Sequence, residues 1–455
     1  MKKSVAIIGA GPIGLAAAAH VLESGLTPIV LEAGPDIGHA MREWAHVQLF
    51  SPWEYNIDHA ASRLLTATGW NSPDPHGYPT GGELLERYLE PLAAKTALKE
   101  HIRTSSRVTD ISRAGLDKLK SAGRNEAPFE IRYQNGQGPK IMQVDAVIDA
   151  SGTWFSPNPA GANGLLAIGE RDASARIAYG MPDVLGRDRP RYAGKIVAVL
   201  GAGHSAVGTL IELTELKRQA PDTRAVWLLR GDNPAKAFGG GANDKLSARG
   251  ALGQQFAALV ASGDIKVEAE FRVSDITLEI EGLRIGGGRS VFVDELIVAT
   301  GFRPDHSFLR ELRIQLDPAV ESPVALAPLI DPNEHSCGTV RPHGAAELAQ
   351  PEPGFFFAGM KSYGRAPTFL MMTGYEQVRS IAAALAGDEE GARRVDLVLP
   401  ETGVCSRAPV AGNAGGCSSS LAASTADACC TSKAAAQQER KAGSGCGGAA
   451  KAWAQ

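Results

Sequence analysis

Short, largely apolar runs recur along the chain, and four of them fall into two similar pairs. The first pair is Val5–Ile8 with Pro28–Leu31, and the second is Lys195–Leu200 with Ala225–Leu229. Runs of this length, bounded by glycine or charged residues, are typical of strands buried in a parallel sheet. A glycine-containing turn and a helix-like run separate the members of each pair. The order strand, turn, helix, strand is therefore predicted twice.

Weaker patterns add further elements. Thr80 is suited to cap a helix whose apolar positions recur at helical spacing, and Glu376–Leu385 has the same periodicity. Asn135 and Gly136 are turn residues between two predicted strands. Strands are predicted at Ile102–Ile111, Phe129–Tyr133, Val144–Asp149 and within Gly354–Met360. Strands that alternate with helices predict an α/β fold.

The first strand runs into Gly9, Gly11 and Gly14, spaced as Gly-x-Gly-x-x-Gly. The first glycine of such a motif makes the turn, the second lets the backbone approach a pyrophosphate, and the third lets the helix pack closely on the strand. Glu32 ends the next strand, about 20 residues on, where a carboxylate binds ribose hydroxyls. These features predict a dinucleotide site. They disfavour the alternative, an export signal starting at Lys2, because neither the glycine spacing nor Glu32 has a role there.

The second strand–turn–helix unit carries Gly201 and Gly203, with Ala206 in the third position, a substitution that the motif allows. Arg230 ends its second strand, where the first unit has Glu32. A cation suits the 2′-phosphate of NADPH, whereas a carboxylate would repel it. We therefore predict FAD at the first turn and NADPH at the second. The alternative for Arg230 is an ordinary solvated arginine at a strand end.

Two similar turns flank the second unit. One is Ala150-Ser151-Gly152, and the other is Ala299-Thr300-Gly301. Their likeness predicts that the chain crosses there between two Rossmann-like domains, the alternative being a pair of ordinary strand-end turns. We predict a discontinuous FAD-binding domain of residues 1–155 and 296–395, an inserted NADPH-binding domain of residues 156–295, and a tail of residues 396–455.

Most residues expected to bind a cofactor lie in these turns. The segment Trp44–Trp53 is dense in aromatic residues and either packs as a buried loop or lies over a flat ring system. The predicted cofactor-binding residues are Gly9, Gly11, Pro12, Ile13, Gly14, Glu32, Ala33, Gly38, Trp44, Val108, Ser151, Gly152, Gly201, Gly203, His204, Ser205, Ala206, Arg230, Gly301 and Gly359. No catalytic side chain is predicted.

Composition narrows the classes of partner. The formal net charge of -4 gives no reason to expect nucleic acid or an acidic membrane surface. No apolar run approaches the roughly 18 residues of a membrane span. Cys337 is the only cysteine before position 400, so no disulfide framework is expected and a cytoplasmic location is predicted. A homodimer is one open option for the assembly.

The segment beyond about Pro400 is dominated by Ala, Gly and Ser, and it is predicted to be disordered. It holds five cysteines, among them Cys429, Cys430 and Cys446. One interpretation is a low-complexity appendage with incidental cysteines. The other is a set of soft thiolate ligands, led by these three, for As(III), Sb(III), Cu(I) or Zn(II). The spacing matches no zinc-finger pattern.

The stretch Arg191–Ala206 resembles the flavin-containing monooxygenases among the flavoproteins with two dinucleotide-binding domains. Two positions depart from that family's signature upstream of the second turn, because Ala178 replaces its Phe and Val184 replaces its His. The related thioredoxin reductases have a C-x-x-C motif and an Asp after the late Ala-Gly turn, whereas this chain has no C-x-x-C and has Met360 there. With its cysteine-bearing tail, the chain most resembles the flavoprotein monooxygenases associated with bacterial arsenic resistance.

The resemblance implies an enzyme in which NADPH reduces FAD and the reduced flavin, with O2, oxidises a soft nucleophile. Trivalent arsenic or antimony compounds would be apt small-molecule substrates. Two alternatives stay open. One is an NADPH-dependent flavoprotein reductase of a disulfide or quinone partner, and the other is a thiol-based metal-binding or redox-sensing flavoprotein.

Overall fold

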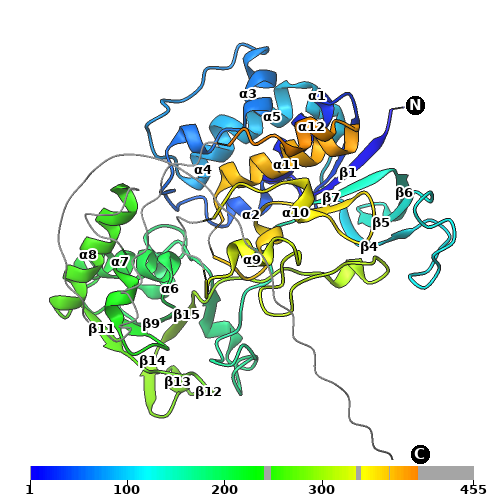
Figure 1. Cartoon of the computed structure of the whole chain (residues 1–455). Helices are drawn as coiled ribbons and strands as arrows, with labels where there is room; N and C mark the ends of the chain where they lie inside the picture. The colour runs from blue at the N-terminus through cyan, green and yellow to red at the C-terminus, as the bar shows by residue number, and fades with distance from the viewer. Residues whose placement is uncertain (1, 240–246, 335–339, 368, 398–455) are drawn as a thin grey trace, which may run out of the picture. The chain divides into compact units, whose positions relative to one another are not determined.

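The computed structural model describes residues 2–239, 247–334, 340–367 and 369–397. These residues belong to one compact unit, Met1–Arg407, most of whose elements are labelled in Figure 1. The second unit, Ala408–Gln455, lies outside the described residues. Among the described residues, no helix combines the length and the apolar character needed to cross a bilayer.

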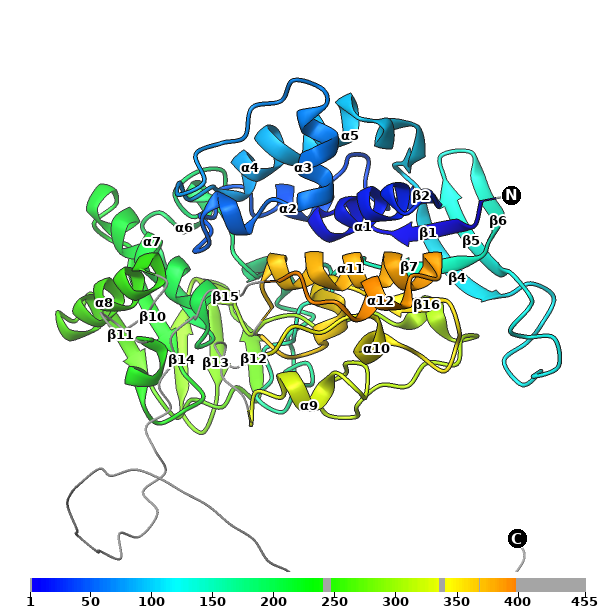
Figure 2. The ribbon, with the colours of Figure 1, turned by 45° about the horizontal axis from the view of Figure 1, so that its top comes forward.

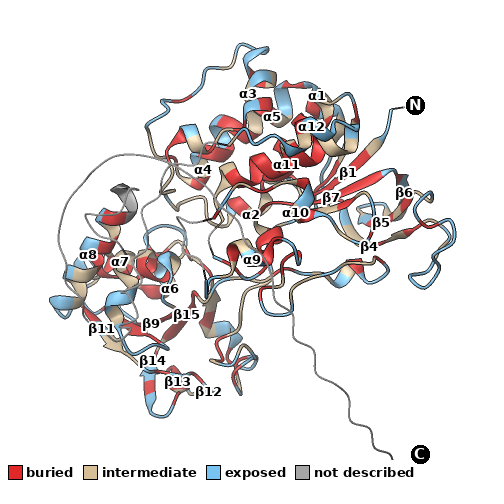
Figure 3. Cartoon of the chain, viewed as in Figure 1, coloured by how far each residue is buried: buried red, intermediate tan, exposed pale blue. Residues whose placement is uncertain are grey.

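The unit has two halves, each built on a parallel sheet. The half that contains the N-terminus, called the first half, has the sheet order β16-β7-β1-β2-β3, so it includes a strand from late in the chain. Its strands are β1 (Ser4–Ile8), β2 (Thr27–Leu31), β3 (Ile102–Arg103), β7 (Ala146–Asp149) and β16 (Phe355–Phe357). The helices α1 (Pro12–Glu23) and α11 (Met371–Ala386) pack against each other, and both are largely buried (Figures 2 and 3).

A three-stranded antiparallel sheet covers the first parallel sheet. It consists of β4 (Arg107–Arg113), β5 (Phe129–Asn135) and β6 (Gly138–Val144). Phe129 and Ile131 from this sheet share one apolar cluster with Ala6, Ile8 and Val147 of the parallel strands. Every residue of β7 is buried, as expected for a central strand with both faces covered.

The second half repeats this plan. Its parallel sheet has the order β11-β10-β9-β15-β8. The strands are β8 (Ile177–Tyr179), β9 (Ile196–Leu200), β10 (Arg224–Leu228), β11 (Ile265–Glu268) and β15 (Glu295–Val298). The helices α7 (His204–Gln219) and α8 (Ser247–Ala261) pack together. A second antiparallel sheet adds β12 (Asp275–Leu278), β13 (Leu283–Gly286) and β14 (Ser290–Val293), whose residues Ile285 and Val293 share an apolar cluster with Ala198 and Val226.

The remaining helices are short and connect these layers. They are α2 (His39–Arg42), α3 (His59–Thr66), α4 (Gly81–Leu84), α5 (Glu90–Lys95), α6 (Arg189–Tyr192), α9 (Ala327–Ile330), α10 (Ala345–Leu348) and α12 (Glu389–Arg393). Thr80 caps α4 as predicted. Its hydroxyl accepts from the Glu83 amide, and the Glu83 carboxylate accepts from the Thr80 amide. A π-helical turn at Leu85–Leu89 follows before α5.

The α/β prediction is confirmed, but two local predictions are wrong. The single strand predicted at Ile102–Ile111 is two strands in different sheets, β3 and β4. The chain breaks at Ser105, whose φ of 49° is incompatible with a strand, and the neighbouring Ser106 amide donates to the Glu32 carbonyl at 2.7 Å. The bounds of the strand predicted at Val144–Asp149 are also wrong, because Val144 ends β6, which pairs with β5 across the Asn135 turn, and only Ala146–Asp149 forms β7 in the parallel sheet.

The sheet orders bear on the division into domains. The second sheet uses strands between Ile177 and Val298, so β15 belongs to it as a whole. We therefore place the later boundary of the inserted domain after Val298, a few residues beyond the predicted one. The four-part division itself stays a prediction, and its tail lies almost wholly outside the described residues.

Candidate functional site

The first glycine turn is shaped by close backbone approach. Gly9 has a φ of +100°, and a Cβ built on it would lie 2.8 Å from the Ala150 carbonyl oxygen. A Cβ built on Gly14 would lie 1.9 Å from the Gly9 carbonyl oxygen. Only glycine fits at these two positions, as the motif requires.

Gly11 has a different environment. It is the N-cap of α1, it adopts an ordinary extended conformation, and no side chain caps the helix there. No atom lies within 4 Å of a Cβ built on it. Pro12 occupies the first turn, and Ile13 packs against Gly359 and Gly374. An uncapped helix N-terminus with open space above it fits a pyrophosphate, because its free N–H groups point outward.

Glu32 ends β2 and is only 8% exposed. Its carboxylate accepts hydrogen bonds from the Ala10 amide at 2.7 Å and the Gly34 amide at 2.8 Å. A carboxylate has about four acceptor positions, so two remain for ribose hydroxyls. Gly38 brings its loop to the same turn, because its amide donates to the Ala10 carbonyl oxygen at 2.9 Å.

Three other predicted FAD residues are placed differently. Ala33 follows Glu32 and is exposed. Val108 lies on β4 and packs against the apolar cluster between the two sheets of the first half. Trp44 packs over Gly81, and its ring lies 6.5 Å from that of Trp154. Contact between these residues and a cofactor stays a prediction.

The remaining predicted FAD residues lie at the carboxyl end of the first sheet. Ser151 donates its hydroxyl to the Asp149 carboxylate at 2.7 Å, and the Gly359 amide donates to the Gln377 side chain at 2.8 Å. Gly152 has a φ of +70° with no atom near its built Cβ. Our sequence reasoning missed Lys361, which forms an ion pair with Asp149. A lysine within the largely apolar stretch that follows β16 was the available signal.

The second glycine turn resembles the first. Gly201 has a φ of +145°, and a Cβ built on it would lie 2.3 Å from the Ala299 carbonyl oxygen. Gly203 is the uncapped N-cap of α7, with no atom within 4 Å of its built Cβ. Ala206 is fully buried, so its methyl group is accommodated in the third position. Ser205 follows His204 in the first turn of this helix.

Two further residues extend the second turn. The ring of His204 lies 5.2 Å from that of Phe50, which brings the aromatic segment to the N-terminus of α7. Trp53 of the same segment is only 3% exposed and joins the core, so the segment combines buried packing with a contact at the second turn. Arg230 is exposed, and its guanidinium donates to the Ala162 carbonyl oxygen at 3.3 Å.

The two predicted crossings run side by side. Gly152 and Gly301 both have positive φ angles. The rings of Trp154 and Phe302 stack with centroids 4.8 Å apart, and the Asn158 amide donates to the Gly301 carbonyl oxygen at 2.9 Å. Because β7 and β15 belong to different sheets, each turn marks a passage between the halves, as predicted.

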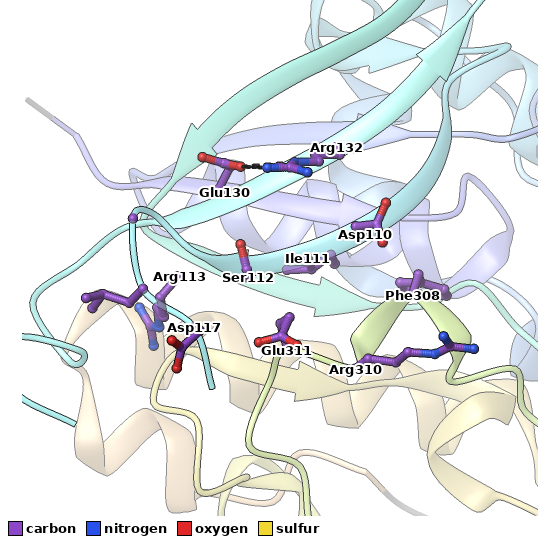
Figure 4. Close-up of a pocket in the computed structure, with 12 residues that line it drawn as sticks. Asp110, Ile111, Ser112, Arg113, Asp117, Glu130, Arg132, Phe308, Arg310 and Glu311 are labelled. Carbon is purple, nitrogen blue, oxygen red and sulfur yellow. Dashed lines mark hydrogen bonds and ion pairs between the residues drawn. The ribbon is translucent and has the colours of Figure 1, made fainter. Parts of the chain in front are cut away.

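A cavity of about 420 Å³ lies elsewhere, beside the antiparallel sheet of the first half (Figure 4). Its lining includes Phe308, Arg310 and the ion-paired Glu130 and Arg132. None of the predicted cofactor residues lines it.

The predicted thiolate ligands Cys429, Cys430 and Cys446 lie outside the described residues. The described residues contain no group of three or more His, Cys, Asp or Glu side chains that could hold a metal ion.

Comparison with known proteins agrees with the two glycine turns. A family model described as pyridine nucleotide-disulphide oxidoreductase matches residues 6–326, more than half of the chain. The chain belongs to this family. Membership in the pyridine nucleotide-disulphide oxidoreductases makes it an oxidoreductase with FAD and NADPH as cofactors, and both cofactor predictions are thereby confirmed.

The proteins related to this chain in sequence include flavin-containing monooxygenases. FMO GS-OX-like 2 of Arabidopsis thaliana is 22% identical over 241 residues, which covers 48% of each chain. Flavin-containing monooxygenase 3 of Rattus norvegicus is 25% identical over 223 residues, which covers 48% of this chain and 39% of the relative. The chain thus spans half or less of the length of these relatives.

Solved structures show the same fold. Bacillithiol disulfide reductase of Bacillus cereus matches with a TM-score of 0.62 and 22% identity, covering 86% of this chain and 100% of the other. DfoA, an FAD-bound cadaverine monooxygenase of Erwinia amylovora, matches with a TM-score of 0.61 and 14% identity, covering 88% and 99%. The fold therefore occurs in both a reductase and a monooxygenase.

Proposed function

We propose that this chain is an NADPH- and FAD-dependent monooxygenase that oxidises a soft nucleophile. The observation that carries the proposal is the pair of dissimilar nucleotide turns in one compact unit, Glu32 serving one and Arg230 the other, in a chain without a C-x-x-C motif. The sequence likeness to flavin-containing monooxygenases supports it. The chain has no C-x-x-C motif of the kind with which thioredoxin reductases reduce a disulfide.

The residues of the chain bind and orient the cofactors, while the flavin, when bound, supplies the redox chemistry. The uncapped helix ends at Gly11 and Gly203 provide N–H donors for phosphates. The partly buried Phe50 supplies apolar surface beside the second turn, which helps to exclude water from the reacting groups.

For the substrate we propose trivalent arsenic or antimony, as arsenite, antimonite or an organoarsenical. The support is chemical, because Cys429, Cys430 and Cys446 are soft thiols that favour thiophilic ions. Their proposed role is to deliver the substrate to the flavin.

The test measures NADPH oxidation and O2 uptake together, with purified, FAD-loaded protein. Addition of a trivalent arsenical or antimonial should raise both rates equally and yield the pentavalent product. A rate that no arsenical or antimonial changes would reject the substrate assignment. NADPH oxidation without product, whatever the soft nucleophile, would reject the oxygenase.

A second candidate is an NADPH-dependent reductase of a disulfide or quinone partner. It is favoured by the family model that matches residues 6–326, whose description is pyridine nucleotide-disulphide oxidoreductase. Reduction of a small disulfide or a quinone under anaerobic conditions, at the rate of NADPH loss, would identify this activity.

A further inference from the structure

A buried ion pair lies at the carboxyl end of the first parallel sheet. The Lys361 ammonium lies 2.6 Å from the Asp149 carboxylate, and the two side chains are 1% and 0% exposed. Asp149 is the last residue of β7, and its neighbours in register are Ile8 and Phe357, the last residues of β1 and β16. In open α/β sheets, ligands bind outside this edge.

The ion pair is connected to a predicted cofactor residue. The Ser151 hydroxyl accepts a hydrogen bond from Lys361 at 3.0 Å and donates to the other oxygen of Asp149 at 2.7 Å. The Ser151 amide donates to that same oxygen at 3.1 Å. The three side chains form a closed network that fixes the turn at residues 150–152.

This turn is in direct contact with the first glycine turn. A Cβ built on Gly9 would lie 2.8 Å from the Ala150 carbonyl oxygen and 3.0 Å from the Ser151 Cα. Any shift of residues 150–152 would therefore move the backbone that leads to the N-terminus of α1. Lys361 reaches that backbone through Asp149 and Ser151.

Asp149 is the carboxylate in contact with the Lys361 ammonium, and the more distant Asp305 also interacts with this charge. The ammonium lies 4.4 Å from the centroid of the Phe308 ring. Burial, together with the Lys361 charge, lowers the pKa of the neighbouring His306 to about 4, so this imidazole is neutral near pH 7. A buried ion pair contributes little net stability, because desolvation offsets the attraction between the charges. A structural role alone does not explain its place at this edge.

A comparable buried cluster of charged side chains lies at the opposite end of the first parallel sheet, before β16. The Glu352 carboxylate accepts from Arg113 at 2.8 Å and from Arg124 at 2.7 Å, and all three side chains are nearly or fully buried. Glu352 precedes β16, whereas Lys361 follows it, so this cluster is at the amino end of the sheet. It provides a control in which a buried charge can be removed away from the cofactor edge.

We propose that Lys361 is a positioning residue for FAD, which acts through Asp149 and Ser151 to hold the turn at residues 150–152 against the Gly9 turn. A cradle that is fixed before the ligand arrives binds it more tightly, because less ordering is required on binding. The inference rests on FAD as the cofactor and is independent of the substrate that the enzyme oxidises.

The experiment measures the FAD dissociation constant of the apoprotein from flavin fluorescence, with the apoprotein Tm recorded in parallel. Lys361→Met should weaken FAD binding about tenfold or more, since a charged hydrogen bond that orders the cradle is lost. Lys361→Arg, which keeps the cation, should recover a large part of the affinity. Glu352→Gln should lower the Tm while leaving FAD affinity within about twofold of the original chain.

The double variant Lys361→Met/Asp149→Asn separates folding from positioning, because it leaves no unpaired buried charge. It should regain most of the Tm lost in Lys361→Met while FAD binding stays weak. FAD binding by the double variant that equals the original chain would overturn the proposal. The proposal would also be overturned if Glu352→Gln lost FAD affinity in proportion to its loss of Tm. Neither outcome depends on oxygenase activity, so failure here is distinct from failure of the proposed function.

Discussion

The two halves of the unit share one plan and differ at the residue that ends the second strand. In the first half, Glu32 is almost buried and both of its oxygens accept backbone hydrogen bonds. In the second half, Arg230 is exposed and makes one long hydrogen bond, to the Ala162 carbonyl oxygen. The difference suits a resident cofactor on one side and a dissociating one on the other. A preordered, buried site retains its ligand, whereas a mobile surface cation recognises a ligand that comes and goes.

The largest difference between the two halves is expected for substitutions at the third position of the two glycine motifs, which is Gly14 in the first and Ala206 in the second. Gly14→Ala would place a methyl group 1.9 Å from the Gly9 carbonyl oxygen, so α1 could not pack on β1. We expect loss of FAD and of cooperative thermal unfolding. The reverse change, Ala206→Gly, should lower the Tm by only a few degrees, because a buried methyl group is lost. Calorimetry and the flavin absorbance measure both, and normal FAD content in Gly14→Ala would contradict the assignment of the first turn.

The second position separates the two cofactors without disturbing the fold. Gly11 and Gly203 have ordinary φ angles and no neighbouring atom within 4 Å of a built Cβ. Gly203→Ala should therefore keep FAD and the original Tm, while NADPH binding weakens about 100-fold because the methyl group meets the phosphates. Gly11→Ala should keep the apoprotein Tm and lose FAD. Titration calorimetry with each cofactor tests both, and an exchanged pattern would mean that the cofactor assignments are reversed.

The strand-end residues should produce a smaller effect. Arg230→Ser removes the cation proposed to bind the 2′-phosphate, so KM for NADPH should rise about 10- to 100-fold while KM for NADH changes little. Steady-state reduction of the bound flavin with each nucleotide measures the ratio. Lys236→Ser, an exposed cation nearby that is paired with Asp232, is the matched control. Equal losses in the two variants would assign Arg230 to the solvated surface.

The smallest expected effect concerns α7, the helix that follows the second glycine turn. The helix α7 carries Glu212, and burial, with a contribution from Asp183, raises the pKa of this carboxyl group to about 7. Since the folded-state pKa exceeds the ordinary value of 4.5, the contribution to stability is complete below about pH 4.5 and is lost as the pH rises through 7. Glu212→Gln should thus raise the Tm by a few degrees more at pH 8 than at pH 5.

The reference for this pH dependence is the original chain, whose Tm is measured at the same two values of pH. An effect of Glu212→Gln that does not change between pH 5 and pH 8 would contradict the raised pKa.

The sequence was most informative where the chemistry is local. Gly9 and Gly14 could be identified because their spacing alone encodes a turn and a close helix contact. Lys361 could not, because its partner Ser151 lies 210 positions away and only the order of the strands brings them together. The break at Ser105 was missed for a similar reason. The weak alternation of Ile102–Ile111 does not mark the break. It is fixed by the Ser105 and Ser106 amides, which donate to the carbonyl oxygens of Gly34 and Glu32, residues distant in the sequence.

The paired crossings have a consequence for how such a chain can be assembled. Pro157 and Phe302 are bridge partners, so the inserted half enters and leaves at one point of the first half. A gene segment encoding residues 158–301 could therefore be removed and replaced by a short linker, without separating β7 from β16. The remaining protein would be a flavin module without a nicotinamide module, and the excised segment would have its two ends already side by side.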